Sequence, residues 1–159
     1  MSNTLFRSPL MTVEPQWTDY NGHLNMAYYN VLFDRGADFG IGELGITLDY
    51  VKNRKLTIYT AEIHVCYLRE LHQGHQVYAT FQIVDFDEKR LHVFQQLHHE
   101  DGWLAATSEV LSLHIDMSGP KVVAFPDDVM TKIETMAKVH ANLGRPAGAG
   151  RSIGIKRKV

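Results

Sequence analysis

The 159-residue chain is short of cysteine and of long apolar runs, and each shortage excludes a class of protein. Its one cysteine, Cys66, has no partner within the chain, which argues against a secreted domain held by disulfides. No apolar run approaches eighteen residues, and no positively charged start leads into an unbroken apolar stretch. We therefore expect a cytoplasmic protein with neither a secretion signal nor a membrane span.

The chain also lacks an excess of positive charge, since 16 Lys and Arg stand against 18 Asp and Glu, so no nucleic-acid partner is expected. Five of those basic residues lie in the last fifteen positions, which carry no acid. We interpret residues 145–159 as a solvated basic tail, although such an arm can also bind the phosphates of an anionic ligand or RNA. Residues 1–144 then form one domain, because they contain neither a repeat nor a linker.

Hydrophobic periodicity predicts a strand, a long helix, four long strands and a last helix. Two prolines in the first strand, at 5–17, confine it to a sheet edge or make it bulged. The long helix runs from Asn25 to about residue 39, where glycines at 40–45 end it, and a short helical turn follows at 48–53. Its apolar stripe is Leu24, Tyr28, Val31, Leu32 and Phe39.

Alternating residues predict the four long strands at 56–69, 76–86, 90–100 and 103–116, joined as consecutive antiparallel hairpins. The last helix starts at Pro126, and Gly144 ends it. Its buried face is Val129, Ile133, Met136, Ala137 and His140. The sequence therefore predicts an α+β domain in which an antiparallel sheet wraps around a long central helix. One helix leaves sheet edges uncovered, which favours a homo-oligomer.

Three patterns that often carry chemistry lack the context that they need. The G-x-G-x-x-G pattern at 40–45 follows a helix rather than a strand, so it predicts a helix end and not a dinucleotide site. The pairs at 72/75 and 98/99 are histidines without the further ligands of known metal motifs, and we predict no metal site. Cys66 lies within a strand, where a cysteine usually acts as a small buried residue.

The segment from Trp17 to Asn25 places a carboxylate, an imidazole and two amides directly before the long helix. The unpaired N–H groups of a helix N-terminus polarise a carbonyl and stabilise the oxyanion that forms on attack. Asp19 would then act as a nucleophile or draw a proton from water, with His23 and Asn25 orienting the site. The same residues also suit an Asx turn followed by an N-cap, and their spacing does not decide between the two.

Asp19, Gly22, His23 and Asn25 resemble the Asp-x-x-Gly-His-x-Asn signature of hotdog-fold acyl-CoA thioesterases of the 4-hydroxybenzoyl-CoA thioesterase type. With the strand order and length, the resemblance covers nearly all of residues 5–142. It implies hydrolysis of an acyl-CoA to CoA and a free acid without metal or cofactor, coenzyme A being part of the substrate. It also implies that Asp19 is the catalytic carboxylate and that the Met26 N–H is the oxyanion donor. The family commonly has a further acid two residues before Asp19, where this chain has Trp17.

In that family two protomers form each site, within a homodimer or a tetramer of dimers. A strand of the second chain faces the helix terminus of the first. Thr60, Glu62 and His64, which alternation places on one face of the 56–69 strand, are the candidates for substrate binding in this role. The alternative is that this strand face is simply exposed to water.

The sequences of residues 19–25, 60–64 and 67–71 further resemble those of the betainyl-CoA thioesterases linked to carnitine breakdown, whose product is glycine betaine. A quaternary ammonium prefers aromatic faces with a nearby anion. Glu62 is the candidate anion, and the candidate aromatic residues are Trp17, Tyr20, Tyr28, Tyr29, Phe33 and Trp103. These aromatics also suit a plain core, which leaves open an aryl- or fatty-acyl-CoA thioesterase and a non-catalytic acyl-CoA-binding module.

Overall fold

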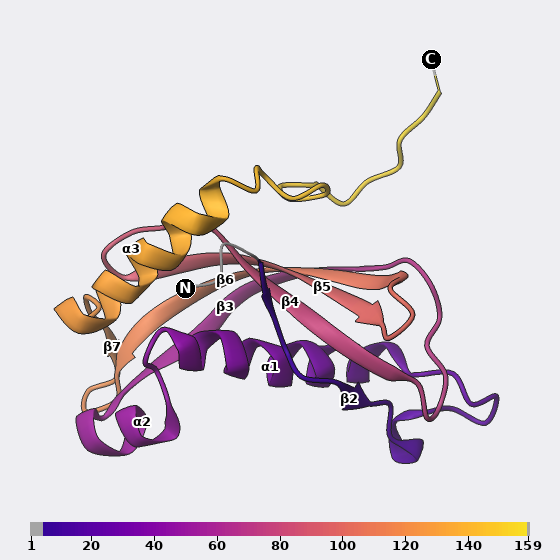
Figure 1. Cartoon of the computed structure of the whole chain (residues 1–159), viewed down its shortest axis with the longest axis horizontal. Helices are drawn as coiled ribbons and strands as arrows, with labels where there is room; N and C mark the ends of the chain where they lie inside the picture. The colour runs from indigo at the N-terminus through magenta and orange to yellow at the C-terminus, as the bar shows by residue number, and fades with distance from the viewer. Residues whose placement is uncertain (1–4, 159) are drawn as a thin grey trace.

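The computed structural model describes residues 5–158 as one antiparallel sheet curved around a long helix (Figure 1). The strands are β1 (Phe6–Arg7), β2 (Met11–Thr12), β3 (Leu56–Tyr67), β4 (Gln76–Phe86), β5 (Arg90–His99), β6 (Leu104–Asp116) and β7 (Lys121–Val122). The helices are η1 (Pro15–Trp17), α1 (Met26–Glu43), α2 (Leu48–Arg54) and α3 (Asp127–Ala141). This architecture confirms the predicted α+β hotdog fold.

The long strands form where alternation predicts them, but their order is not a simple meander. The sheet runs β1-β4-β5-β6-β3, with β2 beside β4 and β7 beside β6. Short turns join β4 to β5 and β5 to β6 as expected, whereas β3 pairs with β6 and not with the next strand along the chain. The expected hairpin between β3 and β4 is wrong, because turn residues encode local pairing while the β3–β6 pairing is between distant segments. As a result, no strand within residues 5–158 covers the outer edge of β3.

The N-terminal segment is two short strands and a 3-10 turn rather than one strand over 5–17. Phe6 pairs with Phe81 and Met11 pairs with Val77, both on the same side of β4, so the predicted edge position is confirmed. Pro9 lies between the two short strands and has no N–H for a ladder, which explains the interruption.

Helix α1 begins where the sequence predicts and ends later. The Asn25 side chain accepts the Ala27 N–H at 3.0 Å, which is an N-cap bond. The predicted end near residue 39 is wrong, because Gly40 lies inside the helix against the Phe81 ring, where an added Cβ would stand 2.5 Å from the nearest ring atom. The helix ends at Glu43 with Leu44 as its C-cap, followed by Gly45 at φ +89°, so the last glycine of the G-x-G-x-x-G pattern does end it.

The buried face of α1 also differs from the predicted stripe. Tyr28 and Phe39 are 37% and 46% exposed. The helix instead buries Tyr29, Leu32, Phe33, Gly36 and Gly40. Two of these five are glycines, which carry no side chain to mark an apolar stripe, so hydrophobic periodicity placed the stripe partly on the neighbouring face.

The core falls into two clusters along α1. The first holds Leu24, Tyr29 and Leu32 against the α1-facing side of β4 and β5, and the second holds Phe81, Leu91, Val93, Phe125 and Ile133. Helix α3 closes the second cluster with its predicted face, since Val129, Ile133 and His140 are buried and Met136 and Ala137 are partly buried. No helix within residues 5–158 has the length and apolar character that crossing a membrane requires.

Two short elements and the tail complete the arrangement. Helix α2 forms where it is predicted, and its Arg54 pairs with Asp128 of α3 at 2.7 Å, at the end of the sheet where β7 also lies (Figure 1). The chain after α3 runs along the side of the sheet opposite α1. There the Gly150 N–H donates to the Glu109 carboxylate at 2.8 Å. The division into a 1–144 domain and a 145–159 tail stays a prediction.

Candidate active site

The segment before α1 folds into a tight, internally bonded turn. Thr18 and Leu24 form an isolated antiparallel bridge, and the Asp19 N–H donates to the His23 carbonyl at 2.9 Å. Gly22 has a φ of +76°, a conformation that glycine adopts without strain. The turn therefore sets the distance from Asp19 to the start of the helix.

The Asp19 side chain is exposed and held by the backbone of its own turn. Its Oδ1 accepts the N–H groups of Asn21 at 2.9 Å and His23 at 3.1 Å. Both bonds fall on one oxygen, so the second carboxylate oxygen keeps its lone pairs for a substrate or for water. The Asx turn that the sequence allowed is thus present, and it orients a reactive group without consuming it.

The N-terminus of α1 is strapped to the same turn. The Asn25 N–H donates to the Trp17 carbonyl at 2.9 Å, and the Asn25 side chain caps the helix. Met26 is the first residue of α1, so its N–H is one of the amides that find no acceptor inside the helix. The Tyr67 hydroxyl donates to the Met26 carbonyl at 3.0 Å, which fastens the end of β3 to this point. One short segment therefore carries both the acid and the candidate oxyanion donor.

Most of the aromatic residues expected to form a cage pack on groups of their own chain, and three of them, Trp17, Tyr29 and Phe33, share the first core cluster. Trp17 is buried and stacks on Tyr28 with ring centroids 6.1 Å apart, while the Arg35 guanidinium lies 4.9 Å from the Trp17 ring. Tyr20, at the tip of the turn, is 97% exposed. Trp17 is therefore already packed against side chains of α1, whereas Tyr20 has few contacts within its own chain.

The remaining aromatics are also engaged elsewhere. Tyr29 and Phe33 belong to the core, and the Tyr29 hydroxyl accepts the Leu71 N–H at 3.2 Å. Trp103 stacks on His99 at 4.7 Å, and the Arg69 guanidinium lies 4.1 Å from the Trp103 ring. Packing partners within the chain already hold most of these six rings, and a cage around one ligand stays a prediction.

A β-bulge in β3 separates the three residues that alternation placed on one face. Thr60 pairs with Ser112 and Glu62 pairs with Leu111, so Ala61 is an extra residue with no partner of its own. Such a residue moves every later side chain to the opposite face. Thr60 consequently faces α1, whereas Glu62 and His64 face the other side of the sheet. The expectation of a shared face for Thr60, Glu62 and His64 is wrong for this reason.

A cavity of about 440 Å³ lies between α1 and the strands. Val31 and Asp38 of α1 and Thr60 and Ile63 of β3 are part of its wall. Partial burial, and then the neighbouring Asp34, raise the pKa of Asp38 above its usual value. Asp19 is not part of this wall, so a single chain keeps this cavity apart from the candidate catalytic acid.

Glu62 and His64 border a second hollow of about 340 Å³, between the sheet and the C-terminal segment. Glu109, also in its wall, is bonded to His92 at 2.7 Å and to the Gly150 N–H. The pKa of Glu109 is lowered, because the hydrogen bonds from Gly150 and His92 outweigh the opposing effect of burial. Next to His64, Cys66 is half-buried rather than buried, and its Sγ lies 3.7 Å from the His64 Nε2.

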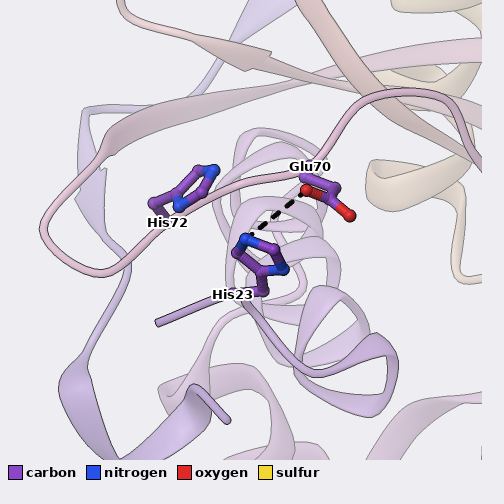
Figure 2. Close-up of side chains that lie close together, drawn as sticks. All are labelled: His23, Glu70 and His72. Atoms are coloured by element: carbon purple, nitrogen blue, oxygen red, sulfur yellow. Dashed lines mark ion pairs between the residues drawn. The ribbon is translucent and has the colours of Figure 1, made fainter. Parts of the chain in front are cut away.

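The His23 side chain is turned toward the segment after β3 (Figure 2). Its Nε2 lies 3.6 Å from a Glu70 carboxylate oxygen, and its ring meets the His72 ring edge to face at 4.6 Å. His72 is exposed, as expected for a surface turn. Sequence reasoning missed the grouping with Glu70, because the backbone bridge between His23 and His72 joins segments with no common local motif.

A curved antiparallel sheet around α1, with an acid-bearing turn at the start of that helix, defines a hotdog-fold protein with a candidate site at the helix N-terminus. The model of the thioesterase-like superfamily matches residues 13–133 of this chain. The chain belongs to this family.

Individual relatives agree with this assignment. A betainyl-CoA thioesterase of Pseudomonas aeruginosa is 32% identical over 153 residues, which cover 96% of this chain and 94% of that protein. An L-carnitine dehydrogenase/betainyl-CoA thioesterase of a Rhizobium species is 38% identical over 146 residues, but this chain spans only 29% of its length. A Staphylococcus aureus protein solved in complex with CoA superimposes with a TM-score of 0.89 at 34% identity, covering 98% of both chains.

Proposed function

We propose that the protein is an acyl-CoA thioesterase that hydrolyses betainyl-CoA to glycine betaine and CoA, with Asp19 as its catalytic carboxylate. The observation that carries the proposal is the Asp19 side chain, which its own turn holds by Oδ1 directly before the N-terminus of α1. The name of the Pseudomonas aeruginosa relative supports the substrate, and the CoA complex of the Staphylococcus aureus structure supports an acyl-CoA ligand.

The chemistry follows from the two groups on this segment. The thioester carbonyl oxygen accepts the Met26 N–H, and the positive end of the α1 dipole stabilises the oxyanion as it forms. Asp19 either attacks the carbonyl carbon, or it takes a proton from a water molecule that attacks instead. The thiolate of CoA leaves in both routes, and water supplies the remaining oxygen of the free acid. Neither route uses a cofactor.

We also propose that a second copy of the chain completes the site. The outer edge of β3 has no neighbour among the described strands, and Tyr59, Ile63 and Tyr67 of this strand are 49%, 49% and 45% exposed. A long apolar edge strand of this kind is normally covered. Pairing of β3 edges in a homodimer would bring the strand of one chain toward the helix start of the other. The separation of Asp19 from the cavity within one chain supports this arrangement. The cytoplasmic location of the protein stays a prediction.

A hydrolysis screen with purified protein tests the proposed activity. Betainyl-CoA, benzoyl-CoA and straight-chain acyl-CoAs are supplied separately, and release of free thiol is measured. We expect the highest kcat/KM on betainyl-CoA, and a loss of about 100-fold or more in Asp19→Asn, in line with the usual contribution of a general base or nucleophile. Asp49→Asn, an exposed acid in the first turn of α2, is the matched control and should retain full activity.

Each other outcome points to a definite alternative. Higher kcat/KM on aryl or long-chain substrates would keep the enzyme and Asp19 but remove the cationic substrate. Equal rates for the wild type and Asp19→Asn would remove Asp19 from the chemistry. Tight CoA-ester binding without turnover of any substrate would indicate a binding module. A loss confined to the cationic substrate in Glu62→Gln would support Glu62 as its anionic partner.

A further inference from the structure

Three metal-ligating side chains meet on the surface where two distant segments run side by side (Figure 2). His23 and His72 form an isolated antiparallel bridge. The Leu24 N–H donates to the Leu71 carbonyl at 2.9 Å, and the Gln73 N–H donates to the Gly22 carbonyl at 3.0 Å. Backbone hydrogen bonds thus hold the two segments together without the help of a ligand.

Buried neighbours hold this pairing in place. Leu24 is 6% exposed and Leu71 is fully buried, both in the first core cluster. The Tyr29 hydroxyl accepts the Leu71 N–H, which ties the second segment to α1. With the leucines directed inward, the histidines next to them are directed outward, so the fold presents the two imidazoles together on a rigid support.

The donor atoms lie at separations close to those of a bound metal. One ligand atom from each of His23, Glu70 and His72 lies within 4.8 Å of the other two. The His23 Nε2 and Glu70 Oε2 are 3.6 Å apart, which is too long for a hydrogen bond. Metal–ligand bonds of about 2.0–2.2 Å in a tetrahedron put ligand atoms roughly 3.3–3.6 Å from one another. Small rotations of side chains that are exposed or half-exposed are sufficient to reach that geometry.

We propose that His23, Glu70 and His72 form a binding site for a divalent transition metal ion, with Zn²⁺ as the ion of best fit. Two imidazoles and one carboxylate are a common zinc ligand set, and a water molecule takes the fourth position. The bound ion ties the Asp19-bearing turn to the segment after β3, since the His23 N–H donates to the Asp19 carboxylate. This binding is independent of the proposed hydrolysis, which uses no metal.

Titration of the EDTA-treated, dialysed full-length protein with ZnCl₂ tests the site by calorimetry and by thermal unfolding. We expect one saturable Zn²⁺ per chain and an increase in Tm with Zn²⁺ concentration, because the ion binds the folded state in preference to the unfolded one. His72→Asn should weaken binding at least tenfold and remove most of the Tm increase. MgCl₂ should give no comparable effect, since Mg²⁺ prefers oxygen ligands.

Two further variants separate this site from other histidines. His98→Asn, which removes a half-buried imidazole of β5 outside the cluster, should bind Zn²⁺ as the wild type does. Glu70→Gln should weaken binding while both imidazoles remain. Absence of saturable binding to the wild type, or equal affinity in the wild type and His72→Asn with unchanged circular dichroism, would overturn the proposal. Because the readouts are affinity and Tm, a failure of the hydrolysis screen leaves these results unaffected.

Discussion

His114 and His140 are the two histidines that the fold buries most completely, at 0% and 2% exposure. The His140 Nδ1 accepts the Ile83 N–H at 2.9 Å, and the His114 Nε2 lies 2.7 Å from the Tyr50 hydroxyl. Burial lowers the pKa of His140, and it lowers the pKa of His114 against the opposing effect of nearby backbone carbonyls. Both side chains are therefore held neutral at pH values where free histidine becomes charged.

This burial predicts a loss of stability in acid. The unfolded chain binds protons at these two positions near the ordinary histidine pKa of about 6.5, whereas the folded chain binds them only at lower pH. The free energy of unfolding should therefore fall as the pH drops below about 6.5. His140→Asn keeps a side-chain acceptor for the Ile83 N–H and does not titrate, so its stability should change less between pH 7.5 and pH 5. Urea unfolding at several pH values measures both slopes, and identical slopes would contradict the role of His140.

At the scale of single residues, the sequence predicted what is local and missed what is not. Asp19, His23 and Asn25 lie within one turn, so their grouping before the helix was readable from their spacing. The positions of Thr60 and Glu62 on opposite faces depend on a bulge, and alternation has no means of locating one. The approach of Glu70 to His23 depends on tertiary pairing and leaves no local pattern.

Helix α1 contains two glycines near its end that differ in their surroundings. A Cβ on Gly40 would stand 2.5 Å from the Phe81 ring, which is 1% exposed and has no room to move aside. A Cβ on Gly42 would meet nothing within 4 Å. The two positions therefore separate close packing from helix propensity within one element.

Alanine at these positions should have opposite effects. We expect Gly40→Ala to lower the free energy of unfolding by about 1–3 kcal/mol, the usual cost of overpacking. Gly42→Ala should raise it by up to about 1 kcal/mol, since alanine favours the helix over glycine. Urea unfolding of both variants measures the difference. A neutral Gly40→Ala would show that α1 does not need its close approach to β4.

At the scale of elements, the existence and type of each long helix and strand were predictable, whereas the segments that they pack against or pair with were not. Strong alternation predicted the four long strands, Asn25 as N-cap predicted the start of α1, and Pro126 with the acids that follow it predicted the start of α3. The pairing of β3 with β6 and the burial of Gly36 and Gly40 both arise from contacts between distant segments. Local propensity contains no information about such contacts.

The free edge of β3 governs the expected behaviour of the whole molecule. Ile63 lies on it and is 49% exposed. If two copies pair through this edge, Ile63→Lys should place a charge in the interface and shift the protein toward a monomer. We expect the monomer to lose thioester hydrolysis as well. Size-exclusion chromatography with light scattering measures the mass of each form.

Leu143→Lys is the matched control for this change. Leu143 is 45% exposed but follows α3, away from the β3 edge. This variant should keep the mass and activity of the wild type. An Ile63→Lys protein of unchanged mass would show that the β3 edge is not the interface.

The order of one long helix and four long strands was sufficient to predict the fold class of the whole chain. The same order does not encode how many copies assemble. It also does not show how firmly the residues after 144 are held, and the bond from Gly150 to Glu109 shows that part of this segment contacts the sheet. That contact joins a backbone N–H to a side chain more than forty positions earlier, and amino-acid composition cannot predict such a contact.

The extra residue Ala61 divides β3 into two frames of opposite phase. Ile58 and Thr60 face α1 before it, and Ile63 faces α1 after it, so the inward positions change from even to odd. Two related chains that differ by this single residue would direct the side chains beyond it to the same sides of the sheet, because a strand without the bulge alternates regularly from Thr60 onward. Deleting Ala61 would therefore remove the bulge and leave Glu62 and His64 on the side of the sheet away from α1, with Ile63 still on the side toward it.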